Sequence, residues 1–114
     1  MQTTPNQPPA LPAPIAGYFA HETTSPAAVA RFFTDDALVV DERREHRGRA
    51  AIEAWDAAAN GQYKLTTELL AAEFDGPRTT VRAKVTGTFP GSPIELRFRF
   101  TLEGGLITRL EIAP

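Results

Sequence analysis

The chain has 114 residues, of which 42% are hydrophobic and 23% charged, and its formal net charge is −2. This length suits one domain, and the near-neutral charge excludes the strong basic field that draws proteins to nucleic acid or anionic membranes. The absence of Cys excludes disulfides, zinc–thiolate sites and thiol nucleophiles.

Two further features concern location. No apolar run approaches the roughly 20 residues that a helix needs to cross a membrane. The first Lys or Arg is Arg31, so the amino terminus lacks the positive segment of a signal peptide. We therefore expect a soluble, cytoplasmic protein whose partners include neither membrane nor nucleic acid.

The amino-terminal segment is rich in proline, with five of the ten prolines inside residues 1–14. A segment of this composition packs poorly into a core. It predicts a flexible tail over residues 1–13 and one domain over residues 14–114.

Two short helices are expected next. Pro14 suits the first turn of the first helix. Its apolar face consists of Ile15, Tyr18 and Phe19. Ser25 is typical of an N-cap and Pro26 of a first helical residue, so a second helix begins there and ends at residues 34–36. Its apolar face consists of Val29, Phe32 and Phe33.

A short strand and a third helix follow. "ALVVD" (residues 37–41) is apolar on both faces, as in a buried strand. Residues 42–45 ("ERRE") indicate a solvated loop. Nearby arginines interleave with Glu42 and Glu45, which predicts mutual pairing. Residues 48–61 predict a helix with Gly61 beyond its last turn. Its apolar stripe consists of Ile52, Trp55 and Ala59, and Asp56 is a further candidate for the rim of a site.

From Tyr63 onward the hydrophobic period changes to two, which indicates strands over residues 63–74, 79–89, 94–102 and 106–112. "FPGSP" predicts a type II turn and "EGGL" a tight hairpin. In the third of these strands Phe98 and Phe100 face inward while Arg97 and Arg99 face outward. Arg82 and Lys84 share this outer face, where Glu68 and Glu95 are expected to pair with some of the cations.

The order of elements predicts an α+β fold. We expect a cone-shaped, curved antiparallel sheet with three helices packed on its concave face, enclosing a pocket that holds a ligand at its open end.

Four stretches carry a family resemblance: "YFAHETTSPAAVARFFTDDALVVD", "HRGRAAIEAW", "GTFPGSPIELRFRFTL" and "GGLITRLEI". Together they resemble the nuclear transport factor 2-like superfamily, which includes SnoaL-like polyketide cyclases and ketosteroid isomerase. The "FPGSP" turn is similar to one subgroup of small bacterial SnoaL-like proteins. The resemblance implies a cone-shaped pocket and a homodimer, but not one chemistry, since this fold hosts isomerases, dehydratases, cyclases, hydrolases and binding domains.

Asp41 is the first candidate catalytic residue. It shares a strand face with Ala37 and Val39 by period two, so it lies at the mouth of the pocket if they line it. The resemblance places it where ketosteroid isomerase carries its general-base Asp, an enzyme that is a standard example of such chemistry. A base of this kind needs a carboxylate beside an apolar cavity. The structural alternative is that Asp41 ends its strand and pairs with Arg43, Arg44 or Arg47.

Tyr18 and His46 complete the catalytic candidates. By resemblance Tyr18 falls near the isomerase's oxyanion-hole Tyr, and the alternative is a packed aromatic with a satisfied hydroxyl. The isomerase's second acid is missing, because Arg97 or Phe98 occupies its place. His46 could titrate near neutrality, although a lone His in a charged loop usually has a structural task.

The predicted ligand-binding wall is aromatic and aliphatic. It consists of Ile15, Phe19, Phe32, Val39, Trp55, Phe89, Phe98 and Phe100. Two separated His residues give no metal-ligand spacing, so neither a metal nor another cofactor is expected.

Two functions remain open from the sequence. One is a cofactor-independent acid–base enzyme of isomerase, cyclase, dehydratase or hydrolase type, with a small apolar carbonyl or polyketide-like substrate and Asp41 as general base. The other is a non-catalytic domain that binds a hydrophobic ligand or serves in dimerisation.

Overall fold

The computed structural model describes residues 10–21, 26–63 and 65–114, with the side chains of residues 21 and 60–63 left out. Within these ranges the helices are α1 (Ala13–His21), α2 (Pro26–Ala30) and α3 (Arg49–Tyr63). The strands are β1 (Phe33–Asp41), β2 (Arg44–Arg47), β3 (Thr66–Asp75), β4 (Arg78–Thr86), β5 (Ile94–Glu103) and β6 (Leu106–Ala113). Residues 1–9 of the predicted tail and the predicted cap Ser25 lie outside the described residues.

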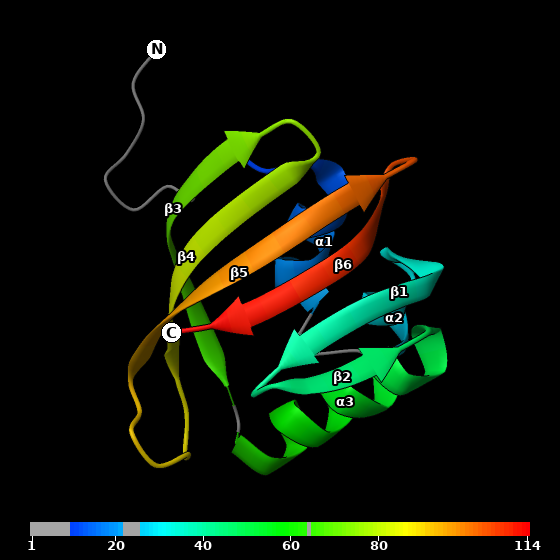
Figure 1. Ribbon diagram of the computed structural model, residues 1–114. Coiled ribbons are helices and arrows are strands. Elements are labelled where there is room, and N and C mark those ends of the chain that lie inside the picture. The colour runs from blue at the N-terminus through cyan, green and yellow to red at the C-terminus, as the bar shows by residue number, and fades with distance from the viewer. Residues whose placement is uncertain (1–9, 22–25, 64) are drawn as a thin grey trace.

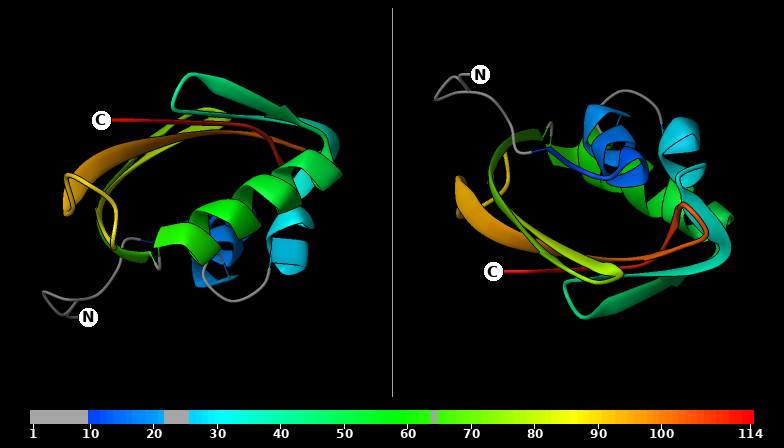
Figure 2. Two further views of the ribbon diagram at one scale, coloured as in Figure 1. Left: turned by 90° about the horizontal axis from the view of Figure 1, so that it is seen from below. Right: turned by 90° about the horizontal axis from the view of Figure 1, so that it is seen from above.

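Across the described residues, six strands form one sheet in the order β2-β1-β6-β5-β4-β3. Neighbouring strands are antiparallel except β1 and β6, which run parallel. The sheet curves strongly, and the three helices lie on its concave side (Figures 1 and 2). This arrangement confirms the predicted α+β fold.

The core lies between the concave face and the helices. Along β4, Thr79, Val81, Ala83 and Val85 are buried while the residues between them are half-buried or exposed, which is the predicted period of two. Phe98, Phe100 and Leu110 continue this buried layer across β5 and β6. The helices cover it with Ile15, Tyr18, Val29 and Ile52. No helix in the described part of the chain is long and apolar enough to cross a membrane.

The second helix is shorter than predicted, because it ends at Ala30 instead of residues 34–36. Its last turn tightens, with Arg31 N donating to Ala28 O and Phe32 N to Val29 O. The carbonyl of Phe32 then accepts a hydrogen bond from Ile107 N, so the chain joins β6. The ladder to β6 therefore replaces the helix from Phe33 onward.

The charged segment after Asp41 is a hairpin and not the predicted loop. Glu42 and Arg43 both have positive φ, 53° and 65°, and form the two-residue turn between β1 and β2. Among the described residues, no ion pair joins an arginine to Glu42 or Glu45, contrary to the prediction. Arg49 instead forms an ion pair with Asp35 at 2.7 Å, and Arg47 donates to the carbonyl of Asp36 at 3.1 Å.

The third helix is longer than predicted. It continues through Gly61 to Tyr63, so β3 begins at Thr66 and not at Tyr63. A glycine inside a helix costs only about 1 kcal/mol, which a helix packed on a core tolerates. The "FPGSP" turn is as predicted, with Phe89 O accepting from Ser92 N and Gly91 at φ 90°.

Candidate functional site

Asp41 lies at the last position of β1, where it contacts α3. Ala37 and Val39 are fully buried on the concave side, and the alternation of the strand places the half-buried Asp41 on the same side. The indole N–H of Trp55 donates to Asp41 Oδ2 at 3.0 Å. Among the described residues, Asp41 forms no ion pair with Arg43, Arg44 or Arg47, so the structural alternative for this residue is not seen.

His46 belongs to the same group. It lies on β2 directly opposite Val39, and its ring centre is 6.0 Å from that of Trp55 with a 34° angle between the planes. Trp55 thus touches a carboxylate on one strand and an imidazole on the next. This group, Asp41, His46 and Trp55, is called the β1–α3 cluster below.

Tyr18 lies in a separate aromatic cluster between α1 and β5. Its side chain is 2% exposed, and its ring centre is 5.0 Å from that of Phe19 and 5.5 Å from that of Phe100. Phe98 lies 6.4 Å from Tyr18 and 5.2 Å from Phe19, again between ring centres. Four predicted residues are therefore brought together on the concave side.

The register of the sheet relates the two clusters. Asp41 is opposite Ile112 of β6, and Ile112 is opposite Phe98 of β5. Adjacent strands are about 4.8 Å apart, so the Cα atoms of Asp41 and Phe98 are about 10 Å apart on one cross-strand row. Phe98 thus shares a cross-strand row with Asp41 and contacts the ring of Tyr18.

The remaining predicted wall residues have mixed positions. Ile15 and Val39 are fully buried core residues. Phe89 is half-buried in the turn between β4 and β5 and packs against the core. Phe32 packs directly on Gly17 of α1, and a Cβ on Gly17 would collide with the Phe32 ring. This contact indicates that Phe32 packs against helix α1.

Asp56 is buried, which corrects its predicted place at a rim. It is 2% exposed and lies four residues after Ile52, which is fully buried, while Trp55 is only half-buried. The described buried residues of α3 are therefore Ile52 and Asp56, and Trp55 of the predicted stripe is half-buried and packs against the core. The i, i+4 spacing from Ile52 is the sequence signal for this position.

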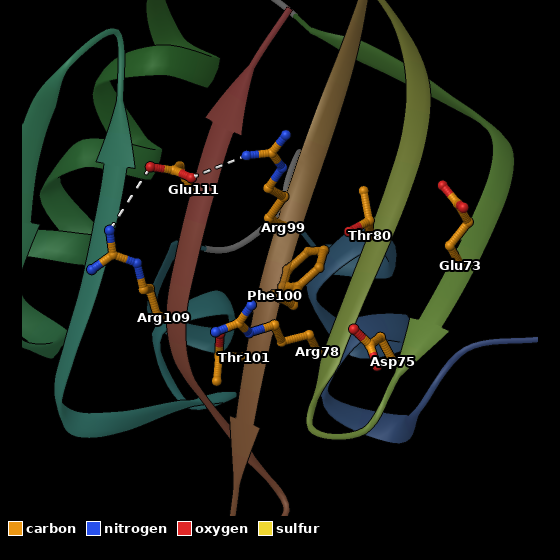
Figure 3. A pocket seen from close by; sticks show the side chains of 9 residues that line it. All are labelled: Glu73, Asp75, Arg78, Thr80, Arg99, Phe100, Thr101, Arg109 and Glu111. Atoms are coloured by element: carbon orange, nitrogen blue, oxygen red, sulfur yellow. Dashed lines mark ion pairs between the residues drawn. The ribbon is translucent and has the colours of Figure 1, made fainter.

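A polar hollow of about 510 Å³ lies over the opposite, outer face of β3–β6 (Figure 3). Most of the side chains that line this hollow are charged or carry a hydroxyl group: Glu73, Asp75, Arg78, Thr80, Arg99, Thr101, Arg109 and Glu111. Glu111 is 3.6 Å from Arg99 and 3.8 Å from Arg109. Nearby, Arg82 pairs with Glu95 at 2.8 Å, as the sequence predicted for this face.

The comparisons with known proteins agree on the fold. Residues 16–110 match the model of the family described as SnoaL-like domain. A structure from Sinorhizobium meliloti, named "putative polyketide cyclase", has a TM-score of 0.87 and 40% identity over 90% of this chain and 95% of that chain.

Two more distant likenesses concern the fold alone. A Catenulispora acidiphila protein with a ketosteroid isomerase-like fold, solved in complex with trimethylamine, has a TM-score of 0.81 and 22% identity over 92% of this chain and 87% of that one. A de novo designed protein with a curved β-sheet has a TM-score of 0.65 and 15% identity, covering 88% of this chain and 95% of that one. None of the curated proteins matches the sequence significantly.

Proposed function

The chain belongs to the SnoaL-like domain family, and from this premise we propose that it is a small-molecule protein with its site on the concave side of the sheet. There Asp41 is the general base of a cofactor-independent reaction on a small apolar carbonyl or polyketide-like compound. The relative named a polyketide cyclase supports this substrate class.

The hydrogen bond from Trp55 to Asp41 is the observation that carries the proposal. It holds Oδ2 at 3.0 Å from the indole nitrogen and so restrains the orientation of the carboxylate. The other oxygen, Oδ1, then takes a proton from the carbon next to the carbonyl group. A general base works well when its orientation is fixed in this way, because little reorganisation is needed in the transition state.

Tyr18 is the proposed hydrogen-bond donor to the substrate oxygen. Its ring centre is 6.4 Å from that of Phe98, which shares a cross-strand row with Asp41. The positions of β5 that match the isomerase's second acid carry none, since Arg97 is exposed on the outer face and Phe98 is a buried phenylalanine. We therefore propose a reaction that uses one carboxylate and one phenol, without the second acid of the isomerase.

The first prediction concerns Asp41→Asn. We expect the wild-type protein to catalyse the exchange of α-protons in D₂O for at least one compound of a panel of small ketones and 1,3-dicarbonyls. The exchange is measured by ¹H NMR. The variant should be slower by about 100-fold or more, since a positioned base contributes roughly 10²–10⁴ in rate.

Asp36→Asn is the matched control, because Asp36 is an exposed carboxylate on the same strand. This substitution should leave the exchange rate unchanged. If Asp41→Asn exchanges protons at the wild-type rate, Asp41 is not the base. If the wild type binds compounds of the panel and exchanges none, the chain is a binding domain, the alternative that the missing second acid favours.

For the assembly, we propose a homodimer in which two copies meet through the outer face. Arg82 and Arg97 are directly opposite each other on β4 and β5, and like charges so placed repel. Glu95 pairs with Arg82, whereas Arg97 has no ion pair among the described residues. A face with both charge signs can pair with itself about a two-fold axis, and a carboxylate of the second copy would then neutralise Arg97.

The second prediction is that Arg97→Glu weakens self-association at least about tenfold in sedimentation velocity at matched concentrations, because it places a carboxylate where the partner's carboxylate lies. Arg44→Glu reverses an exposed charge on β2 and should associate as the wild type does. A monomeric wild type, or a dimer that Arg97→Glu leaves intact, contradicts this interface.

A further inference from the structure

The strand at one edge of the sheet has an open side. β3 is the last strand in the sheet order and pairs with β4 alone among the described strands. It runs for 10 residues, whereas β2 at the other edge has only 4. The backbone N–H and C=O groups along the open side of an edge strand can pair with a further extended chain. A short, charged edge such as β2 offers little to pair with, so β3 is the edge that suits an added strand.

Exposed apolar side chains lie on this strand. Among the described residues, the exposed large hydrophobic side chains are those of Leu70 and Phe74, which are 39% and 59% exposed. Leu70 marks a bulge, since the pairing with β4 shifts between Leu69 and Ala71. Beyond the bulge the ladder is regular, and Phe74 is opposite the buried Thr79, so its ring lies on the inner face of the sheet. An exposed aromatic ring beside an open edge offers a contact to an added strand.

The charges of this strand all have one sign. β3 contains Glu68, Glu73 and Asp75 and neither Lys nor Arg. All three carboxylates are exposed, and none forms an ion pair among the described residues. Glu73 and Asp75 share the outer face, where both line the polar hollow (Figure 3). The regular part of the strand thus combines an acidic outer face with an apolar inner face.

A second copy of the chain does not suit this edge. Residues opposite each other in paired strands share a face of the sheet. Antiparallel pairing of two β3 strands about Glu73 sets that carboxylate opposite itself, and pairing about Phe74 sets Glu73 opposite Asp75. Pairing about Ala72 runs through the bulge and sets Asp75, on the outer face, opposite Leu69, on the inner face. Like charges directly opposite each other are destabilising, so the acidic side chains protect the edge against self-pairing.

We infer that the open edge of β3 binds an extended segment of another protein in which apolar residues alternate with Lys or Arg. The cations of this segment lie on the outer face against Glu73 and Asp75, and its apolar side chains lie beside Phe74 on the inner face. The neighbouring cations of the outer face, Arg78 and Arg82, belong to β4, one strand further into the sheet. Backbone hydrogen bonds supply affinity in such strand addition, and alternate side chains supply specificity. This inference rests neither on the proposed reaction nor on the homodimer.

The third prediction compares three peptides that differ in charge or in backbone pairing. Fluorescein-labelled TVKVKVT, TVEVEVT and TVKPKVT are titrated with the full chain, and binding is followed by fluorescence anisotropy at low salt. The basic peptide should bind about tenfold or more tightly than the acidic one, because its cations then face carboxylates. The peptide with Pro keeps the charge of the first but lacks one N–H and resists strand pairing, so it should also bind about tenfold more weakly.

Hydrogen exchange locates the bound peptide on the protein. TVKVKVT should slow exchange at every second backbone N–H of residues 71–75 in ¹H–¹⁵N spectra, since alternate N–H groups point to the open edge. Binding without slowed exchange at these residues contradicts the inference. Slow exchange of the same groups in the free protein would show that another segment already pairs with this edge, which contradicts it as well.

Substitutions on β3 test the charge contact. Glu73→Lys should weaken binding of the basic peptide at least about fivefold and strengthen binding of the acidic one. Glu53→Lys, at an exposed acid of α3, is the matched control and should change neither affinity. Asp75→Lys makes the same test if circular dichroism shows that Glu73→Lys does not fold. Equal binding of the three peptides, no binding of the basic one, or wild-type affinities in the β3 variant contradicts the inference.

Discussion

Trp55 connects the two halves of the proposed site. Its indole N–H is the donor to Asp41 and its ring faces His46, so one side chain of α3 fixes the ends of two strands. The same helix turn carries the buried Asp56. A change at Trp55 would therefore change the position of Asp41, the proposed base.

We expect Asp41→Asn to keep the fold, because Asn can replace Asp in the contacts of this residue. The side-chain carbonyl of Asn can accept the bond that Trp55 Nε1 now donates to Oδ2, and the side chain is only half-buried. The unfolding free energy should change by about 1 kcal/mol or less, the usual net value of one hydrogen bond. Loss of exchange in this variant is then a chemical effect and not unfolding.

The sequence predicted the concave-side position of Asp41 and missed the burial of Asp56. Alternation with Ala37 and Val39 fixed the side of Asp41, because a strand has two faces and the apolar one is buried. On α3 the predicted stripe of Ile52, Trp55 and Ala59 left out Asp56, because a carboxylate is rarely buried. The i, i+4 spacing from Ile52 indicated the buried position, but the residue type argued against it.

The β1–β2 hairpin shows why elements with unusual turns escape prediction. A two-residue turn with positive φ at both positions normally carries Asn-Gly or Asp-Gly, and here it carries Glu42-Arg43. The four residues of β2, Arg44–Arg47, are also all polar, so this strand shows no apolar alternation. By contrast, Gly104 and Gly105 marked the β5–β6 hairpin clearly, and both have positive φ.

This turn gives the fourth prediction. The double variant Glu42→Asn, Arg43→Gly should raise the unfolding free energy by about 1 kcal/mol, because Gly and Asn occupy the left-handed region at lower cost than Glu and Arg. Urea denaturation with a constant slope measures this. The double variant Glu42→Ala, Arg43→Ala removes the same side chains without relieving the backbone and should show no gain. Equal stability of both double variants would contradict the assignment of strain to this turn.

At the scale of the whole molecule, the strongly curved sheet presents two chemically different faces. The concave face is apolar and aromatic, and the outer face of β3–β6 is polar with charges of both signs (Figure 3). Alternation along β4 and β5 predicted this division, since each residue faces one side or the other. The sheet order could not be predicted, because the parallel pairing of β1 with β6 joins segments at opposite ends of the domain.

The central claim is that ligands bind on the concave side beside Asp41 and not in the outer hollow. The chain contains a single Trp, so its indole N–H gives one assignable signal in a ¹H–¹⁵N spectrum. Titration with a compound that stabilises the protein should shift the Trp55 indole signal and leave the side-chain Nε signals of Arg78 and Arg99 unchanged. An unchanged indole signal with shifted Arg78 and Arg99 signals would place the ligand on the outer face and contradict the claim.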